Sequence, residues 1–193
     1  LILSFSGLSI LTIYISKIFE DNSDTLAELS IRDALTGVYN RRFITDFLQN
    51  ELDTAEKTGN KIYVLMLDID QFKQINDTYG HGFGDHVLLA CVQAAQGVLK
   101  KGDVIARYGG DEFAVILRSP TPIRAAEVGE RILQAISALR FRYEVTVTAS
   151  IGIEQAQPDD TIETLLDRAD QCMYYAKQNG RNQIVNGSIM QPF

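Results

Sequence analysis

A continuous apolar segment that ends in carboxylates constrains the fold of this chain more than any other feature. Residues 62–70 read IYVLMLDID, so no charged residue precedes Asp68, and Asp70 follows two positions later. Runs of this kind are typical of a central β-strand that is buried on both faces. The chain is therefore expected to cover both sides of a sheet with other elements, and to place carboxylates where its central strand ends.

A second acidic segment, residues 107–113, reads RYGGDEF. The flanking residues, 104–106 and 113–117, are mostly apolar or β-branched, as expected for strands. Because glycine permits tight reversals, the pattern predicts a β-hairpin with Asp111 and Glu112 at its tip. Taken alone, such a turn is explained equally well as a solvated hairpin whose acidic residues keep it soluble.

The two acidic segments together predict a carboxylate cluster on neighbouring strands. Two like charges about 4 Å apart repel by roughly 4 kcal/mol at an effective dielectric constant near 20. A hard divalent cation removes that repulsion, and magnesium completes its ligand shell with substrate phosphates. The cluster therefore points to metal-dependent nucleotide chemistry.

Periodic apolar positions outside these strands predict helices that pack on the sheet. Thr121 and Pro122 mark one helix start, and the spacing of Asp160 and Glu163 resembles a capping box at another. Alternating residues predict strands, and the resulting order indicates an α/β (α+β) domain with a mixed central sheet flanked by helices. The further strands are expected at 143–153 and 183–185, and the helices at 41–57, directly after Asp70, beyond a loop over 79–84, after Pro122 and after Asp160.

Composition limits the number of domains and the kinds of partner. With 193 residues, 46% of them hydrophobic, the chain is long enough for one well-buried domain and an appendage. Its net charge of -7, without a basic stripe, argues against binding to nucleic acid. Cys91 and Cys172 fall at apolar helical positions, so free core thiols are favoured over a disulfide.

Residues 1–18 differ in kind from the rest, because no charge precedes Lys17. We expect them to be the end of a transmembrane helix that anchors the protein in the inner membrane, with the catalytic domain in the cytoplasm. The alternative is the last element of an upstream soluble sensor domain. Residues 19–32 are predicted as a helical connector that could pair two chains, followed by the main domain (33–186) and a tail (187–193). The apolar positions of the pairing stripe are Ile18, Phe19, Leu26 and Leu29.

Several motifs in a fixed order resemble the GGDEF family of diguanylate cyclases. DIDQFK at 68–73 and the Asn-Asp pair at 76–77 are followed by GGDEF at 109–113. The resemblance covers about residues 31–185 and implies a palm-like sheet, shared with nucleotidyl cyclases and polymerases, whose metal-binding carboxylates lie on adjacent central strands. The remaining matches are DALTG at 33–37 with NRR at 40–42, YGH at 79–81 with GD at 84–85, and Lys177 with GRN at 180–182.

The resemblance implies two divalent metal ions per active site, magnesium or alternatively manganese. Asp68, Asp111 and Glu112 are the expected ligands, together with the backbone carbonyl of Ile69. Either hairpin acid could also take the proton from the attacking 3′ hydroxyl, and Asp111 is slightly favoured. Successive residues of a strand face opposite sides, so Asp70 points away from the face of Ile69, and we interpret Asp70 as structural.

The remaining candidate residues concern the substrate, GTP. A carboxylate and a carboxamide together can read the donor and acceptor edge of guanine, and Asp85 and Asn76 match the positions that do so in the family. His81 could contact the nucleotide, although the architecture of its glycine-rich loop explains it equally well. Positive charge for the triphosphate is expected from Lys73, Lys177 and Arg181, with plain surface solvation as the alternative for the last two.

The reaction that the resemblance implies joins two GTP into cyclic di-GMP and two pyrophosphates, with two domains face to face in a homodimer. The alternative is a catalytically silent receptor for GTP or cyclic di-GMP. One segment departs from the family pattern, because many members carry an Arg-x-x-Asp product site where residues 100–103 read KKGD. Asp103 is kept, but Lys100 cannot make a planar two-pronged contact, so weak or absent product inhibition is expected.

Overall fold

The structure is a computed structural model that describes residues 31–118 and 121–187. Its strands form one six-stranded mixed sheet in the order β1-β3-β4-β2-β5-β6. The elements, in chain order, are β1 (Tyr39–Asn40), α2 (Arg41–Thr58), β2 (Ile62–Ile69), α3 (Phe72–Tyr79), α4 (His81–Val98), β3 (Val104–Arg107), β4 (Glu112–Arg118), α5 (Pro122–Ser137), a 3-10 turn η1 (Arg142–Glu144), β5 (Ala149–Gln155), α6 (Ile162–Gln178) and β6 (Ile184–Asn186).

Strand β2 lies at the centre of the sheet and is buried along its whole length. It pairs antiparallel with β4 on one side and with β5 on the other. Its side chains alternate between two cores, so that Leu65 and Leu67 belong to one and Val64 and Met66 to the other. The predicted strand with two covered faces is confirmed.

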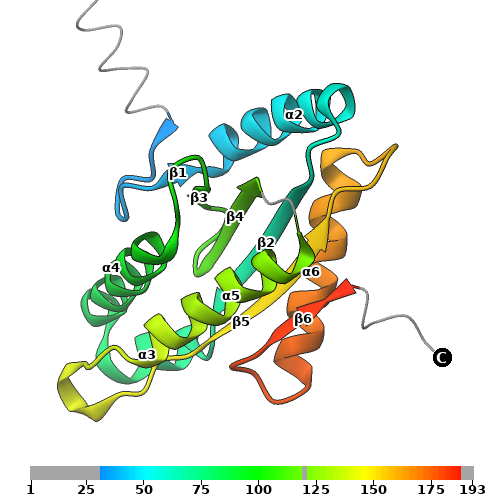
Figure 1. Cartoon of the computed structure of the whole chain (residues 1–193). Coiled ribbons are helices and arrows are strands. Elements are labelled where there is room, and N and C mark those ends of the chain that lie inside the picture. Colours follow the sequence, from blue (N-terminus) through cyan, green and yellow to red (C-terminus); the bar gives the residue numbers. More distant parts are fainter. Residues whose placement is uncertain (1–30, 119–120, 188–193) are drawn as a thin grey trace, which may run out of the picture.

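Helices cover both faces of the sheet and complete a three-layer α/β/α domain (Figure 1). Residues of α3, α4 and α5 pack in the core on one face, and residues of α2 and α6 pack in the core on the other. Gly152 on β5 lets α6 approach closely, since a Cβ there would lie 2.0 Å from the carbonyl oxygen of Ala169. The mixed sheet flanked by helices is the predicted fold class.

Local signals set several element boundaries as expected. The Asn40 side chain accepts a hydrogen bond from the Phe43 amide at the start of α2, and Gly59 ends that helix with φ 71°. Thr121 caps α5 in the same way, by accepting from the Arg124 amide. Both cysteines are buried free thiols, as predicted.

Three boundaries differ from the prediction. Only Gly80, with φ 84°, separates α3 from α4, so the expected loop over 79–84 is mostly helix. The strand expected over 143–153 begins only at Ala149, because Tyr143 and Glu144 have φ 69° and 54° and interrupt extended backbone.

The helix start predicted at Asp160 and Glu163 is also different. The capping box is formed by Thr161 and Thr164, whose side chains and amides bond reciprocally. Asp160 instead accepts hydrogen bonds from Arg168, eight residues further along the chain (2.5 and 2.9 Å). A nearby guanidinium therefore displaces a carboxylate from its expected capping role.

The predicted membrane helix at 1–18, most of the 19–32 connector and most of the 187–193 tail lie outside the described residues. In the part of the chain that the structure describes, no helix combines the length and the apolarity needed to cross a bilayer.

Candidate metal and nucleotide site

Strand register brings the two acidic segments together at one end of β2. Asp68 lies opposite Glu112 in the antiparallel pair, and the Ile69 amide donates to the carbonyl oxygen of Asp111 (3.3 Å). Asp68 is 4% exposed, whereas Asp111 and Glu112 are half-buried. The structure thus places all three carboxylates on adjacent central strands.

The glycines of the hairpin act through close approach rather than through a left-handed backbone. Neither Gly109 nor Gly110 is among the glycines with positive φ. A Cβ at Gly109 would lie 2.5 Å from Oε2 of Glu112, so glycine makes room for that carboxylate. Only Asp111 lies in the turn, because Glu112 is already the first residue of β4.

The Arg107 side chain holds the turn between β3 and β4, a role that was not predicted from the sequence. Its Nε and Nη2 donate to the carbonyl oxygen of Gly110 (3.0 and 2.7 Å), and its Nη1 bonds both oxygens of Asp33 (3.1 and 3.2 Å). Burial raises the pKa of Asp33, but hydrogen bonds from Thr36 and the charge of Arg107 outweigh it and lower that pKa. The motif at 33–37 is therefore tied to the acidic hairpin.

The nearest cation to the cluster is Lys177, from the last turn of α6. Its Nζ lies 2.7 Å from Oδ2 of Asp68, in a pair whose side chains are 28% and 6% exposed. The pKa of Asp68 is raised to about 6, mainly because the carboxylate is buried. Lys177 lowers this pKa, whereas the charges of Asp111 and Glu112 raise it further. Sequence reasoning assigned Lys177 to phosphate and did not foresee this pair.

The donor set fits a hard divalent cation. Burial raises the pKa of Asp68, and the charges of Asp111 and Glu112 raise it further. Oxygen ligands are those that magnesium and manganese prefer. Among residues 31–118 and 121–187, no group of three or more His, Cys, Asp or Glu side chains is arranged so that it could hold a metal ion. One Asp68 oxygen is bonded to Lys177 instead.

Asp70 is bonded to β5 and to the segments beside it. Its carboxylate accepts hydrogen bonds from the Thr148 and Ser150 hydroxyls (2.7 Å each) and from the Asn182 amide (3.1 Å). These bonds join β2, β5 and the segment after α6. The arrangement agrees with the structural interpretation of Asp70.

The two residues expected to read guanine come from adjacent helices. The Asn76 side chain, on α3, lies against Gly84 of α4, where a Cβ would be 1.9 Å from its Oδ1. Asp85, the next residue of α4, is exposed. Glycine at 84 therefore makes room for the Asn76 amide against α4.

The other predicted contacts lie at the surface. Lys73 is in the first turn of α3, His81 begins α4, and Arg181 follows the end of α6 with φ 59°. All three are exposed and, within the described residues, form no ion pair.

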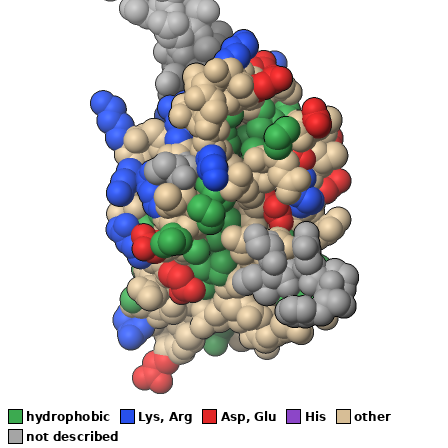
Figure 2. Space-filling model, turned by 45° about the vertical axis from the view of Figure 1, so that its right-hand side comes forward, with side chains coloured by type: hydrophobic (Ala, Val, Ile, Leu, Met, Phe, Trp, Pro, Cys, Tyr) green, Lys and Arg blue, Asp and Glu red, His purple; other side chains and the backbone are tan. Residues whose placement is uncertain are grey.

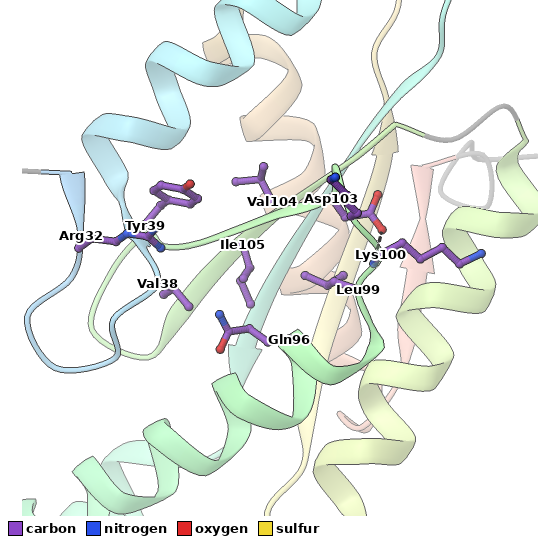
Figure 3. A pocket seen from close by; sticks show the side chains of 10 residues that line it. Arg32, Val38, Tyr39, Gln96, Leu99, Lys100, Asp103, Val104 and Ile105 are labelled. Carbon is purple, nitrogen blue, oxygen red and sulfur yellow. Dashed lines mark hydrogen bonds between the residues drawn. The ribbon is translucent and has the colours of Figure 1, made fainter. Parts of the chain in front are cut away.

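The segment that departs from the Arg-x-x-Asp pattern borders a separate cavity of about 280 Å³ (Figure 3). The Asp103 carboxylate accepts from the Lys100 amide (3.0 Å) and forms an ion pair with Arg124 (3.5 Å) that leaves 3% of its side chain exposed. The Lys100 side chain extends away from Arg32 and Tyr39 on the far side of the cavity. Asp103 is thus committed to internal partners.

Comparison with known proteins agrees with these features. The family described as "Diguanylate cyclase, GGDEF domain" matches residues 30–183. The response regulator PleD of Caulobacter vibrioides is 40% identical over 171 residues, which are 86% of this chain and 38% of PleD. Diguanylate cyclase A of Treponema denticola is 35% identical over 170 residues, which are 84% of this chain and 46% of that protein. The chain thus spans less than half the length of these two relatives.

A solved structure is also similar over nearly the whole chain. It is the coiled coil and GGDEF domain of DgcB from Caulobacter crescentus in complex with c-di-GMP, with a TM-score of 0.87, 29% identity and coverage of 94% of this chain and 97% of that one. Sequence family, fold and the adjacent carboxylates on β2 and β4 lead to the same result. The chain belongs to the GGDEF family of diguanylate cyclases.

Proposed function

We propose that this chain joins two GTP molecules into cyclic di-GMP and releases two pyrophosphates. Each 3′ hydroxyl attacks the α-phosphate of the other nucleotide, so two domains meet face to face, each holding one GTP. The observation that carries the proposal is the register of β2 and β4, which places Asp68 beside Asp111 and Glu112. No residue of this acidic set is replaced in the chain.

Asp68, Asp111, Glu112 and the Ile69 carbonyl would hold two divalent cations, magnesium or alternatively manganese. When bound, such ions activate the attacking oxygen and stabilise charge on the leaving group. Asp111 is the preferred base for the 3′ hydroxyl proton, because it lies in the turn whereas Glu112 is held in β4. Its position is fixed by Arg107 through the neighbouring Gly110 carbonyl.

The helices α3 and α4 would bind the base. Asn76 and Asp85 can together satisfy the donors and the acceptor on the guanine edge, and the contact of Asn76 with Gly84 supports this role. His81, at the start of α4, is a further candidate contact. Charge for the triphosphate would come from Lys73, Lys177 and Arg181.

The residues before the domain would determine how two domains meet. We propose that the apolar stripe of the 19–32 connector pairs two chains, and that 1–18 leads to a membrane anchor or an upstream sensor. The DgcB structure, which contains a coiled coil together with its GGDEF domain, supports this proposal. The tie between Asp33 and Arg107 would link the connector to the catalytic turn.

Product formation by the purified chain tests the proposal. The chain is incubated with GTP and magnesium over a range of protein concentrations, because two domains must meet, and cyclic di-GMP is measured by chromatography. Asp111→Ala should abolish the product. Asp167→Ala, an exposed carboxylate on α6, is the matched control and should not change the rate.

The competing function is a silent receptor. Calorimetry that shows binding of GTP or cyclic di-GMP by a folded, dimeric chain that forms no product would favour that function and end the proposal of catalysis.

A further inference from the structure

Lys177 and Asp68 form a contact at the position where the proposed function requires a metal ion. The ammonium nitrogen lies 2.7 Å from Oδ2 of Asp68, at the buried end of β2. Glu112 lies across the strand pair from Asp68. A side chain therefore supplies positive charge next to this carboxylate.

The backbone that carries Lys177 is held firmly in place. The Asn182 amide donates to Asp70 at the end of β2 (3.1 Å). The Gln183 side chain donates to the carbonyl oxygens of Ala176 and Asn179 (2.8 and 2.7 Å). The end of α6 is thus tied to the strand that bears Asp68, while the ammonium group itself sits on a flexible four-carbon chain.

We infer that Lys177 is a positioning residue that couples metal binding to nucleotide binding. In the free protein its ammonium group takes one Asp68 oxygen and lowers the affinity of the acidic set for a divalent cation. When a triphosphate is present, the ammonium group moves to the phosphate oxygens and releases that carboxylate oxygen. This inference rests on the proposed function, because it uses the same carboxylates and the same nucleotide.

The physical reason is competition between like charges. An ammonium group and a divalent cation on one carboxylate repel each other, and both are favoured by the same three negative charges. A phosphate gives the ammonium group a second anionic partner within reach of the site. By linkage, if the triphosphate strengthens metal binding by a given factor, the metal must strengthen binding of the triphosphate by the same factor.

Titration of the full chain with Mn²⁺ alone, without nucleotide, tests the inference, with free Mn²⁺ followed by electron paramagnetic resonance. Lys177→Met and Lys177→Gln should bind Mn²⁺ at least about tenfold more tightly than the unmodified chain, a typical size for coupling between sites. Adding Asp68→Asn to either variant should remove this gain. Thermal unfolding establishes that each variant is folded. Two different substitutions are used so that the test can still be made if one variant does not fold.

Lys61→Met is the matched control, because it removes the same charge at the opposite end of β2. Lys61 precedes that strand and is exposed, and at about 3.3 Å per residue it lies about 23 Å from Asp68. At this distance salt screens the interaction, so Mn²⁺ affinity should not change. Equal or weaker Mn²⁺ binding by both folded Lys177 variants would overturn the inference. If the unmodified chain still makes cyclic di-GMP, that result leaves the proposed function intact.

Discussion

Asp68 and Asp103 are both buried carboxylates at the ends of strands, but their surroundings have opposite charge. Within the described residues, Asp68 pairs with one cation, Lys177. Burial raises the pKa of Asp68, and the nearby carboxylates of Asp111 and Glu112 raise it further. In the part of the chain that the structure describes, the groups that bond the Asp103 carboxylate are donors, the Lys100 amide and the Arg124 guanidinium. A carboxylate with an excess of negative neighbours keeps the capacity to bind a cation, whereas one that is already neutralised stabilises the fold.

The largest expected effect is on catalysis at Asp68. Asp68→Asn removes a charged metal ligand, so cyclic di-GMP formation should fall by about a thousandfold or more. The free energy of unfolding should not decrease, because the change removes the cost of burying this charge as well as the repulsion with Asp111 and Glu112. Product chromatography and denaturant unfolding measure the two effects, and a strongly destabilised variant would contradict this comparison.

Asn76 provides a test of substrate binding outside the acidic set. Gly84→Ala places a Cβ 1.9 Å from Oδ1 of Asn76 and should displace that amide from the proposed guanine site. The KM for GTP should rise by roughly tenfold, the equivalent of about 1.4 kcal/mol for a lost hydrogen bond. Gly97→Ala, also on α4 but with nothing within 4 Å of the added Cβ, is the control and should leave KM unchanged.

The opposite result is expected at Asp103. Asp103→Asn weakens the pair with Arg124 and should lower the free energy of unfolding by about 1–3 kcal/mol, with little change in the rate of product formation. Because Asp103 is committed to internal partners and Lys100 replaces the usual arginine, micromolar cyclic di-GMP should inhibit neither protein. Inhibition of the unmodified chain that disappears in Asp103→Ala would show that the site still binds product.

A third buried carboxylate, Asp160, should behave like Asp103 and show it through pH. Burial raises its pKa, but the hydrogen bonds and charge of Arg168 outweigh this and lower it below the ordinary value of 3.8. Its contribution to stability is therefore present above about pH 4 and is lost as the pH falls further. Asp160→Asn should lower the free energy of unfolding by up to about 1 kcal/mol at pH 7, and the difference should shrink below pH 4.

Local patterns in the sequence predicted most of the sheet. The apolar run at 62–69 could be interpreted directly because burial on both faces leaves no alternation, and the acidic hairpin followed from its flanking residues. The wrong predictions concern segments whose local pattern is overridden by backbone conformation or by another side chain. Tyr143 and Glu144 continue an alternating pattern but adopt left-handed backbone, and Asp160 has the spacing of a cap but bonds Arg168.

The site was predictable to the extent that it depends on adjacent strands. Once β2 and β4 were expected to be neighbours, Asp68 had to lie near Asp111 and Glu112, because the acids lie where β2 ends and where β4 begins. The contacts of Arg107 with Asp33 and of Lys177 with Asp68 could not be foreseen in the same way. Each joins segments far apart in the chain, and an isolated arginine or lysine carries no local signal of its partner.

The sequence by itself therefore determined the doubly covered strand, the acidic hairpin and the identity of the carboxylates, since these depend on short-range periodicity and on residue type. Only the tertiary structure decided which carboxylates remain available. Packing of α6 against β2 places an ammonium group on Asp68, and the first turn of α5 places the Arg124 guanidinium on Asp103. Charge interactions act through space, so the function of a buried acid depends on neighbours that are brought to it by the fold.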